Sequence, residues 1–123
     1  MPTYIKNLCD NLIIVQAKIA SGQSDSEVVP TGGMALVGVL MPAVWTPAQI
    51  ALKAGISKDA LVSVYSINGQ IQKASADTSR FIPFPTDAVF APLIQILSVD
   101  EDGAAVEQEG ARVLTLVFRK YLS

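Results

Sequence analysis

The chain has 123 residues, of which 50% are hydrophobic and 16% are charged, and its formal net charge is −2. A chain of this length predicts one domain, which buries only about two-thirds of the surface that its unfolded chain exposes. A sequence this apolar has more hydrophobic residues than the interior of so small a domain can bury. We therefore expect part of its apolar surface to contact another protein. The lysines and arginines are scattered along the chain, which argues against a nucleic-acid partner.

No segment predicts a membrane span or an export signal. The longest apolar run, Met34 to Trp45, is shorter than the ~20 residues that cross a bilayer, and Gly38 and Pro42 interrupt it. Asp10 stands where a signal peptide has its apolar core. Cys9 is the only cysteine, which excludes an intrachain disulfide. We therefore expect a protein made in the cytoplasm, without a membrane partner, that packing and association stabilise.

Residues 1–10 show no clear period, and we expect them to form an N-terminal arm ahead of a single β-sandwich domain over residues 11–123. Tyr4, Ile5 and Leu8 are candidate interface residues, either on one face of a helical turn or along an extended arm. The sequence leaves open whether this arm reaches a neighbouring subunit or is held by its own domain.

Strand-like patterns follow at roughly regular spacing, with turn residues between them. They cover residues 11–20, 28–29, 34–41, 49–55, 60–66, 70–74, 80–84, 92–99 and 111–121. The run Met34 to Met41 is apolar on both faces, which is typical of a strand covered on both sides. About eight short strands so spaced predict an all-β fold, a two-sheet β-sandwich and specifically a jelly roll.

Turn and cap signals separate these segments. Gly32-Gly33 predicts a tight bend before the apolar strand. Thr46-Pro47-Ala48 predicts a one-turn helix with Thr46 as its N-cap. Asn68-Gly69 predicts a type I′ hairpin turn, and residues 86–90 predict a single helical turn.

The last strand alternates between apolar and other residues. Its even-numbered positions from 114 to 118 are apolar, so one face belongs to the core. We expect the other face to be partly exposed or to contact a partner, with Val117, Arg119 and Tyr121 as candidate interface residues.

The residue types argue against catalysis. The chain has no histidine, which removes the commonest general base and the commonest transition-metal ligand. One cysteine without histidine excludes a Cys-His pair, and no serine lies in a Gly-x-Ser-x-Gly motif. We predict that the protein is not an enzyme and has no catalytic residue, metal or cofactor.

Acidic residues cluster in the segment 100–110, at Asp100, Glu101, Asp102, Glu107 and Glu109. Oxygen-rich loops bind calcium, but Ala104 and Ala105 occupy positions where the calcium-loop pattern needs a ligand and a glycine. The interpretation that we favour is a solvated acidic loop. A calcium-dependent structural module or a cryptic hydrolase built on this loop is the alternative.

Two single residues allow a functional and a structural interpretation. Trp45 is either a sugar-stacking platform or interface anchor, or a core lid beside Pro42, and we favour the lid. Arg80 follows a polar loop and is interpreted as a surface ion-pair partner in preference to a ligand contact.

Three stretches resemble a known family. Thr31 to Ala48 reads Thr-Gly-Gly-Met-Ala-Leu-Val-Gly-Val-Leu-Met-Pro-Ala-Val-Trp-Thr-Pro-Ala, Ser79 to Phe84 reads Ser-Arg-Phe-Ile-Pro-Phe, and Glu109 to Val117 reads Glu-Gly-Ala-Arg-Val-Leu-Thr-Leu-Val. In these stretches the chain resembles small virion proteins encoded in tailed-phage head gene clusters, the capsid decoration or cement proteins. The resemblance spans about Ser21 to the C-terminus. Its motif residues are Gly33, Gly38, Met41, Pro42, Trp45, Arg80 and Arg112.

The resemblance implies a jelly-roll domain that lies outside an icosahedral shell and clamps neighbouring major capsid subunits. The expected partners are the major capsid protein and further copies of this chain, as a dimer or trimer. The expected location is the outer capsid surface of the virion, after synthesis in the host cytoplasm. The alternative is a tail- or fibre-associated module that binds a carbohydrate or receptor.

Overall fold

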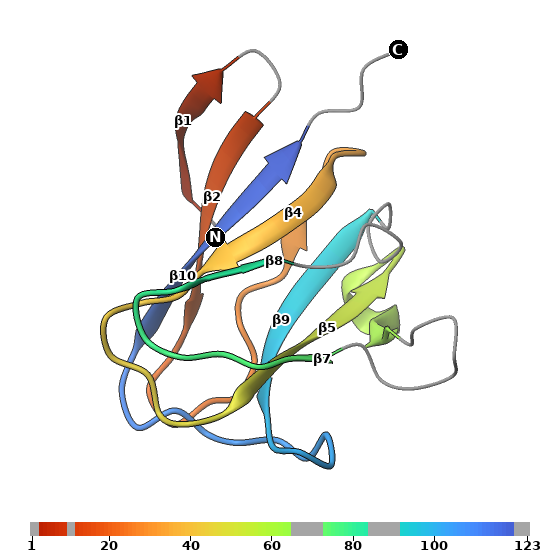
Figure 1. Cartoon of the computed structure of the whole chain (residues 1–123). Coiled ribbons are helices and arrows are strands. Elements are labelled where there is room, and N and C mark those ends of the chain that lie inside the picture. Colours follow the sequence, from red (N-terminus) through yellow and green to blue (C-terminus); the bar gives the residue numbers. More distant parts are fainter. Residues whose placement is uncertain (1–2, 10–11, 65–72, 84–91, 120–123) are drawn as a thin grey trace.

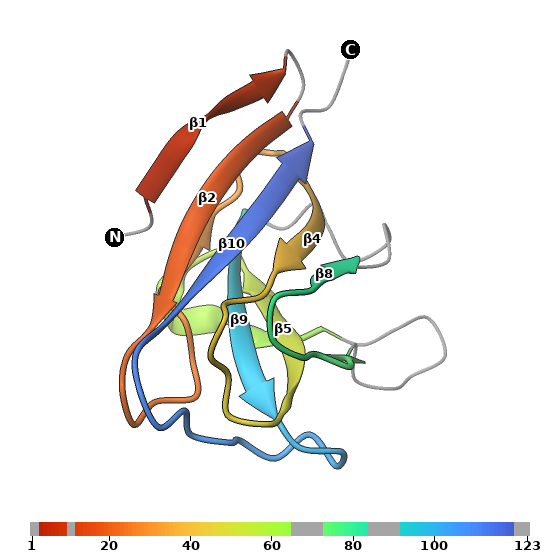
Figure 2. The ribbon, with the colours of Figure 1, turned by 60° about the vertical axis from the view of Figure 1, so that its left-hand side comes forward.

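Two antiparallel β-sheets lie face to face in the computed structural model, which describes residues 3–9, 12–64, 73–83 and 92–119 (Figures 1 and 2). Sheet A has the strand order β1 (Thr3–Cys9), β2 (Leu12–Ile19), β10 (Arg112–Arg119), β4 (Ala35–Leu40) and β8 (Phe81–Pro83). Sheet B has the order β3 (Val29–Pro30), β9 (Leu93–Val99) and β5 (Gln49–Gly55), and the short strands β6 (Val62–Ser63) and β7 (Lys73–Ala74) both pair with β5. A short 3-10 helix, η1 (Lys58–Ala60), precedes β6.

The strand pairing has the nested order of a jelly roll. β2 pairs with β10, β3 with β9, β4 with β8, and β5 with β6 and β7. Strands from the first half of the chain therefore pair with strands from its second half, and successive pairs alternate between the two sheets. This topology confirms the all-β sandwich and the jelly roll. The described residues form ten strands where about eight were expected, since β1 is added at one edge and β6 and β7 pair with the same side of β5.

The core lies between the sheets and consists mainly of inward-facing residues of β2, β3, β4, β5, β8, β9 and β10. In β10 the even-numbered residues from 114 to 118 are buried and the odd-numbered ones are not, as the sequence predicted. Strands β2 and β10 pair in register over eight residues, from Arg112 opposite Ile19 to Arg119 opposite Leu12. The buried core residues include Val15, Ala17, Ile19, Leu36, Val39, Ile50, Leu52, Ile94, Ile96, Leu114, Leu116 and Phe118.

The segment expected as an arm includes strand β1. Thr3–Cys9 pairs antiparallel with β2, with Thr3 opposite Gln16 and Cys9 opposite Leu12 and two register shifts between them. The backbone is therefore extended over these residues. Contact with a neighbouring subunit stays a prediction.

The expectation that strand Met34 to Met41 is covered on both sides is wrong. Strand β4 buries Leu36 and Val39 toward the core, whereas Leu40 on its other face is exposed. An apolar sequence allows a strand to be buried on both faces, but another part of the protein must pack on each face to bury it. Among the described residues, no such layer covers this side of sheet A.

The helix predicted at Thr46-Pro47-Ala48 is also absent, because these residues have no helical structure. The Thr46 hydroxyl oxygen instead accepts hydrogen bonds from the Glu109 backbone N–H and the Arg112 guanidinium. The Thr46 hydroxyl therefore bonds to a segment that is distant in the sequence, and not to the N–H groups of a local helix. The bend at Gly32-Gly33 is confirmed, with φ of 62° and 79°. The predicted Asn68-Gly69 hairpin and the helical turn at 86–90 lie outside the described residues.

A side chain at Gly38 is expected to destabilise the protein. A Cβ atom there would lie 2.5 Å from the Phe81 ring and 2.7 Å from the Ile82 carbonyl oxygen, and that backbone oxygen cannot move without disturbing β8. We predict that Gly38→Ala lowers the free energy of unfolding by about 1–3 kcal/mol in urea titrations.

The control is Ser63→Ala, which introduces the same residue type at an exposed position of strand β6. We expect the control to change stability by less than about 0.5 kcal/mol. Equal effects of the two substitutions would contradict the steric account.

Candidate functional site

The three stretches that carry the family resemblance lie side by side in sheet A. β10, β4 and β8 are adjacent strands, and one row across them joins Thr115, Leu40 and Phe81. The next row on the same face joins Val117, Gly38 and Pro83. Segments that are far apart in the sequence thus form one continuous surface (Figure 2).

This surface faces away from the core and is largely apolar. We call it the outer apolar face and define it by Ile14, Leu40, Phe81, Val113 and Val117, which alternate along their strands with core residues. Leu40 is 45% exposed, Phe81 47% and Val113 43%, while Ile14 and Val117 are partly buried by their neighbours. The polar side chains Gln16 and Thr115 lie opposite each other within it. Large apolar side chains gathered on one sheet face are typical of a protein contact surface.

Gly38 makes room for the aromatic part of this face. The Phe81 ring occupies the space beside β4 that a side chain at position 38 would need. Gly38 also lies opposite Val117, next to the register shift between β10 and β4. Close packing of β8 on β4 therefore explains the motif glycine. Because Gly38 has no side chain, the Phe81 ring can lie against β4 on the outer apolar face.

Motif residues Met41 and Pro42 continue the contact of β4 with β8 beyond the strands. The Met41 N–H donates to the Arg80 carbonyl at 2.8 Å, and the Ser79 N–H donates to the Pro42 carbonyl at 3.0 Å. Met41 is buried, so its side chain also contributes to the core. Backbone pairing thus joins the two resemblance segments from Gly38 opposite Pro83 to Pro42 beside Ser79.

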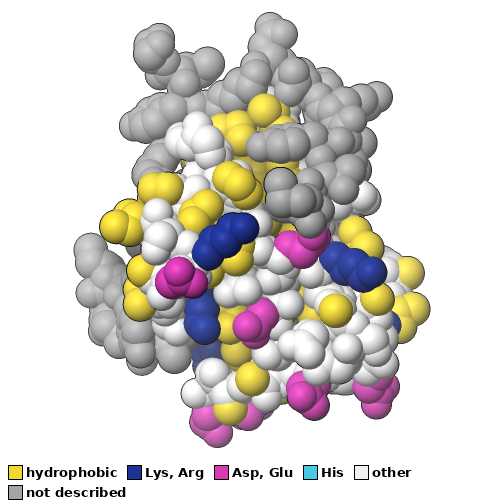
Figure 3. All heavy atoms as spheres, turned by 180° about the vertical axis from the view of Figure 1, so that it is seen from behind, with side chains coloured by type: hydrophobic (Ala, Val, Ile, Leu, Met, Phe, Trp, Pro, Cys, Tyr) yellow, Lys and Arg dark blue, Asp and Glu magenta, His cyan; other side chains and the backbone are white. Residues whose placement is uncertain are grey.

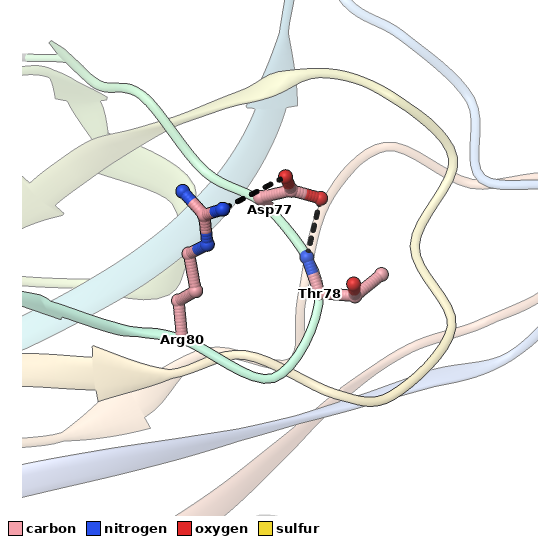
Figure 4. A network of polar contacts seen from close by, with 3 residues as sticks. All are labelled: Asp77, Thr78 and Arg80. Atoms are coloured by element: carbon pink, nitrogen blue, oxygen red, sulfur yellow. Dashed lines mark hydrogen bonds and ion pairs between the residues drawn. The ribbon is translucent and has the colours of Figure 1, made fainter.

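Arg80 lies on the surface, as the sequence interpretation predicted. Its guanidinium is 3.7 Å from the Asp77 carboxylate, and both side chains are exposed (Figure 4). The second Asp77 oxygen accepts a hydrogen bond from the Thr78 backbone N–H at 2.7 Å. An exposed ion pair of this kind contributes little stability.

Trp45 is a core residue. Its side chain is only 7% exposed, and its indole N–H donates to the Ala48 carbonyl at 3.1 Å. The lid interpretation is confirmed, because a buried indole with a satisfied N–H has no free ring face for a sugar.

The best-connected polar residue is Gln108, which the sequence analysis missed. Its side-chain oxygen accepts from the Thr46 N–H at 2.8 Å and the Arg112 Nε–H at 3.1 Å. Its side-chain nitrogen donates to the Thr46 carbonyl at 3.1 Å and the Ser98 hydroxyl at 2.8 Å. The amide thus uses both donors and both acceptor sites, and Gln108 is fully buried. Only the three-dimensional arrangement brings these partners together, so no local sequence signal marks this residue.

The backbone of Gln108 extends the same connection to a third segment. Its N–H donates to the Gln23 carbonyl at 2.9 Å, and its carbonyl accepts from the Gly22 N–H at 2.8 Å. The resulting Gln108 network, comprising Gln108, Thr46, Ser98 and Arg112, ties the loops at one end of the sandwich to β9 and β10. Motif residue Arg112 therefore has a structural role, because it fixes Gln108 and Thr46.

The acidic loop lies at the end of the sandwich, where magenta side chains gather at the bottom of Figure 3. The Asp100 carboxylate accepts from the backbone N–H groups of Asp102 and Ala104, at 2.8 and 2.9 Å. A carboxylate used in this way shapes a tight turn, which Gly103 completes with φ of 86°. Among the described residues, no three histidine, cysteine, aspartate or glutamate side chains are grouped closely enough to hold a metal ion.

The predicted interface residues separate into two groups. Val117 and Arg119 lie on the outer side of β10, with Arg119 exposed. Tyr121 and the side chains of Tyr4, Ile5 and Leu8 lie outside the described residues.

The described part of the chain contains no helix with the length and apolar character required to cross a membrane.

Comparison with known proteins shows a structural likeness. No protein-family model and no curated protein sequence matches the chain. The crystal structure of SPBc2 prophage-derived protein YomS matches with a TM-score of 0.51 and 14% sequence identity, over 88% of this chain and 96% of that one. At this identity the likeness establishes a shared fold over nearly the whole length of both chains.

Removing the Gln108 side chain is expected to destabilise the protein strongly. Gln108→Ala leaves the buried Ser98 hydroxyl and both Thr46 backbone groups without these partners, which predicts a loss of about 2–4 kcal/mol in the free energy of unfolding. Urea titration measures the loss. Glu107→Ala is the control, because Glu107 is the exposed neighbour, and we expect it to change stability by less than about 0.5 kcal/mol. A Gln108 variant as stable as this control would contradict the network's structural role.

Proposed function

We propose that this protein is a structural virion component, which decorates and stabilises the outside of an icosahedral phage capsid by bridging major capsid subunits. The observation that carries the proposal is the adjacency of β10, β4 and β8. The three stretches that resemble capsid decoration proteins form one sheet surface, and that surface presents apolar side chains outward.

The structural neighbour supports the same setting. YomS is described as prophage-derived, and it shares the fold over most of both chains. A phage origin for that protein agrees with the virion proteins that the sequence resembles. The proposed partners are the major capsid protein and further copies of the chain, and the proposed location is the outer capsid surface after synthesis in the host cytoplasm.

The physical properties of the domain suit a clamp. The Gln108 network holds three segments rigidly at one end of the sandwich, and the outer apolar face offers contact area on sheet A. Many copies on a symmetric shell provide multivalent attachment, so that modest contacts for each copy suffice.

The carbohydrate-binding alternative has lost its main support. It depended on aromatic side chains in loops, among which Trp45 was the candidate sugar platform, and the Trp45 ring is buried in the core. We therefore propose no sugar-binding role.

Particles without this protein are expected to be less stable than complete ones. We predict that phage particles lacking it release their genome at lower temperature and survive osmotic shock less well, because the links between neighbouring shell subunits are missing. Genome release on heating, followed with a DNA-binding dye, measures the effect. Adding back the purified protein should restore resistance. Equal resistance of depleted and complete particles would contradict the proposed role.

A further inference from the structure

Asp102 and Gly103 form the only Asp-Gly pair in the sequence. In such a pair the glycine nitrogen can attack the side-chain carboxyl of the preceding aspartate, because glycine has no Cβ atom to hinder the approach. A bond forms between Gly103 N and Asp102 Cγ, the amide hydrogen leaves with the hydroxyl of the protonated carboxyl as water, and a five-membered succinimide ring results. Water then opens the ring at either carbonyl, which gives back aspartate or yields isoaspartate.

The Asp-Gly pair lies in a tight turn after β9, at the lower end of the sandwich in Figure 1. The Gly103 N–H donates to the Asp100 carbonyl at 3.1 Å, and Gly103 has a φ of 86°. Aspartate at the first position and glycine at the fourth are favoured in turns of this kind. Ring closure requires the peptide between residues 102 and 103 to rotate until its nitrogen lies beside the Asp102 side chain. This rotation breaks the hydrogen bond of Gly103, so the closed turn keeps the nitrogen away from the carboxyl.

The Asp100 carboxylate holds the turn closed on both sides of Gly103. Its Oδ1 atom accepts from the Asp102 N–H at 2.8 Å and from the Ala104 N–H at 2.9 Å. The Asp100 N–H in turn donates to the Ala104 carbonyl at 2.8 Å. Hydrogen bonds to an ionised carboxylate are stronger than those to a neutral acceptor. The peptide between residues 102 and 103 therefore cannot rotate without the loss of several bonds to Asp100.

The turn is open to water but is joined to the Gln108 network. Asp102 is exposed, so the water that opens the ring reaches it. Next to the turn, the Val106 N–H donates to the Ser98 carbonyl at 2.9 Å, and the Gln108 side chain binds the Ser98 hydroxyl. Isoaspartate adds one methylene carbon to the backbone, which shifts the two sides of this turn relative to each other. Isomerisation at Asp102 would therefore disturb the segment that positions Gln108.

We propose that Asp102 is a site of spontaneous isomerisation to isoaspartate, and that the turn closed by Asp100 keeps it unmodified while the domain is folded. Isoaspartate then forms at a rate set by the fraction of time for which the turn is open. This chemistry needs only the chain and water, so it does not depend on whether the protein decorates a capsid.

Peptide mapping of the intact protein, after prolonged incubation near neutral pH, measures isoaspartate at residue 102. Trypsin releases residues 81–112 as one peptide, whose isoaspartyl form separates by chromatography without a change of mass, and fragmentation then identifies the modified residue. Asn68-Gly69 is released in the separate peptide 59–73, so deamidation there does not interfere. We expect the folded wild type to isomerise at least about tenfold more slowly than the same chain unfolded in guanidinium chloride. Equal rates, or no isoaspartate at residue 102 in the unfolded chain, would overturn the proposal.

Variants of the turn test the role of Asp100. We expect Asp100→Ala, shown by circular dichroism to be folded, to isomerise at least about fivefold faster than the wild type, because both hydrogen bonds to the carboxylate are lost. Asp100→Asn is the matched control, since its amide oxygen can accept the same two hydrogen bonds, and it should isomerise like the wild type. Asp102→Glu should give no isomer at residue 102, because the corresponding ring has six members and closes far more slowly. A folded Asp100→Ala variant that isomerises at the wild-type rate would overturn the protection by Asp100, and if this variant does not fold, the comparison of folded and unfolded wild type decides.

Discussion

The pairing of β10 with β2 is the interaction on which the rest of the structure depends. It joins the last described strand to one of the first over eight residues in unbroken register, and β10 then positions β4 on its other side. Sheet A cannot form until distant parts of the chain meet, so the fold is dominated by non-local contacts. The surface assembled from β10, β4 and β8 exists only as a result of this pairing.

Close packing across β4 and β8 then determines the character of that surface. Gly38 lets the Phe81 ring lie against β4 and places an aromatic side chain on the outer side of the sheet. At the end of the sandwich, Gln108 holds segments from three parts of the chain with both its backbone and its side chain. A scaffold whose described residues leave an apolar face of sheet A uncovered suits the proposed role of bridging capsid subunits.

The sequence predicted most of this architecture, because alternation along strands depends on local residues alone. Strands β2, β5, β9 and β10 lie within two residues of their expected bounds, and the bend at Gly32-Gly33 is present. The failures have a common physical cause. The Thr46 hydroxyl oxygen accepts hydrogen bonds from a segment more than sixty residues away, and no described residues form the second layer that the apolar sequence of β4 suggested. The role of Gln108 could not be predicted for the same reason, because Thr46, to which its side chain bonds, is distant in the sequence.

Cryo-electron microscopy of virions that carry this protein tests the central claim most directly. The account predicts regular density for the sandwich over the outer shell, at local symmetry axes and in contact with more than one major capsid subunit. Density confined to the tail or to a single vertex, at low copy number, would contradict it.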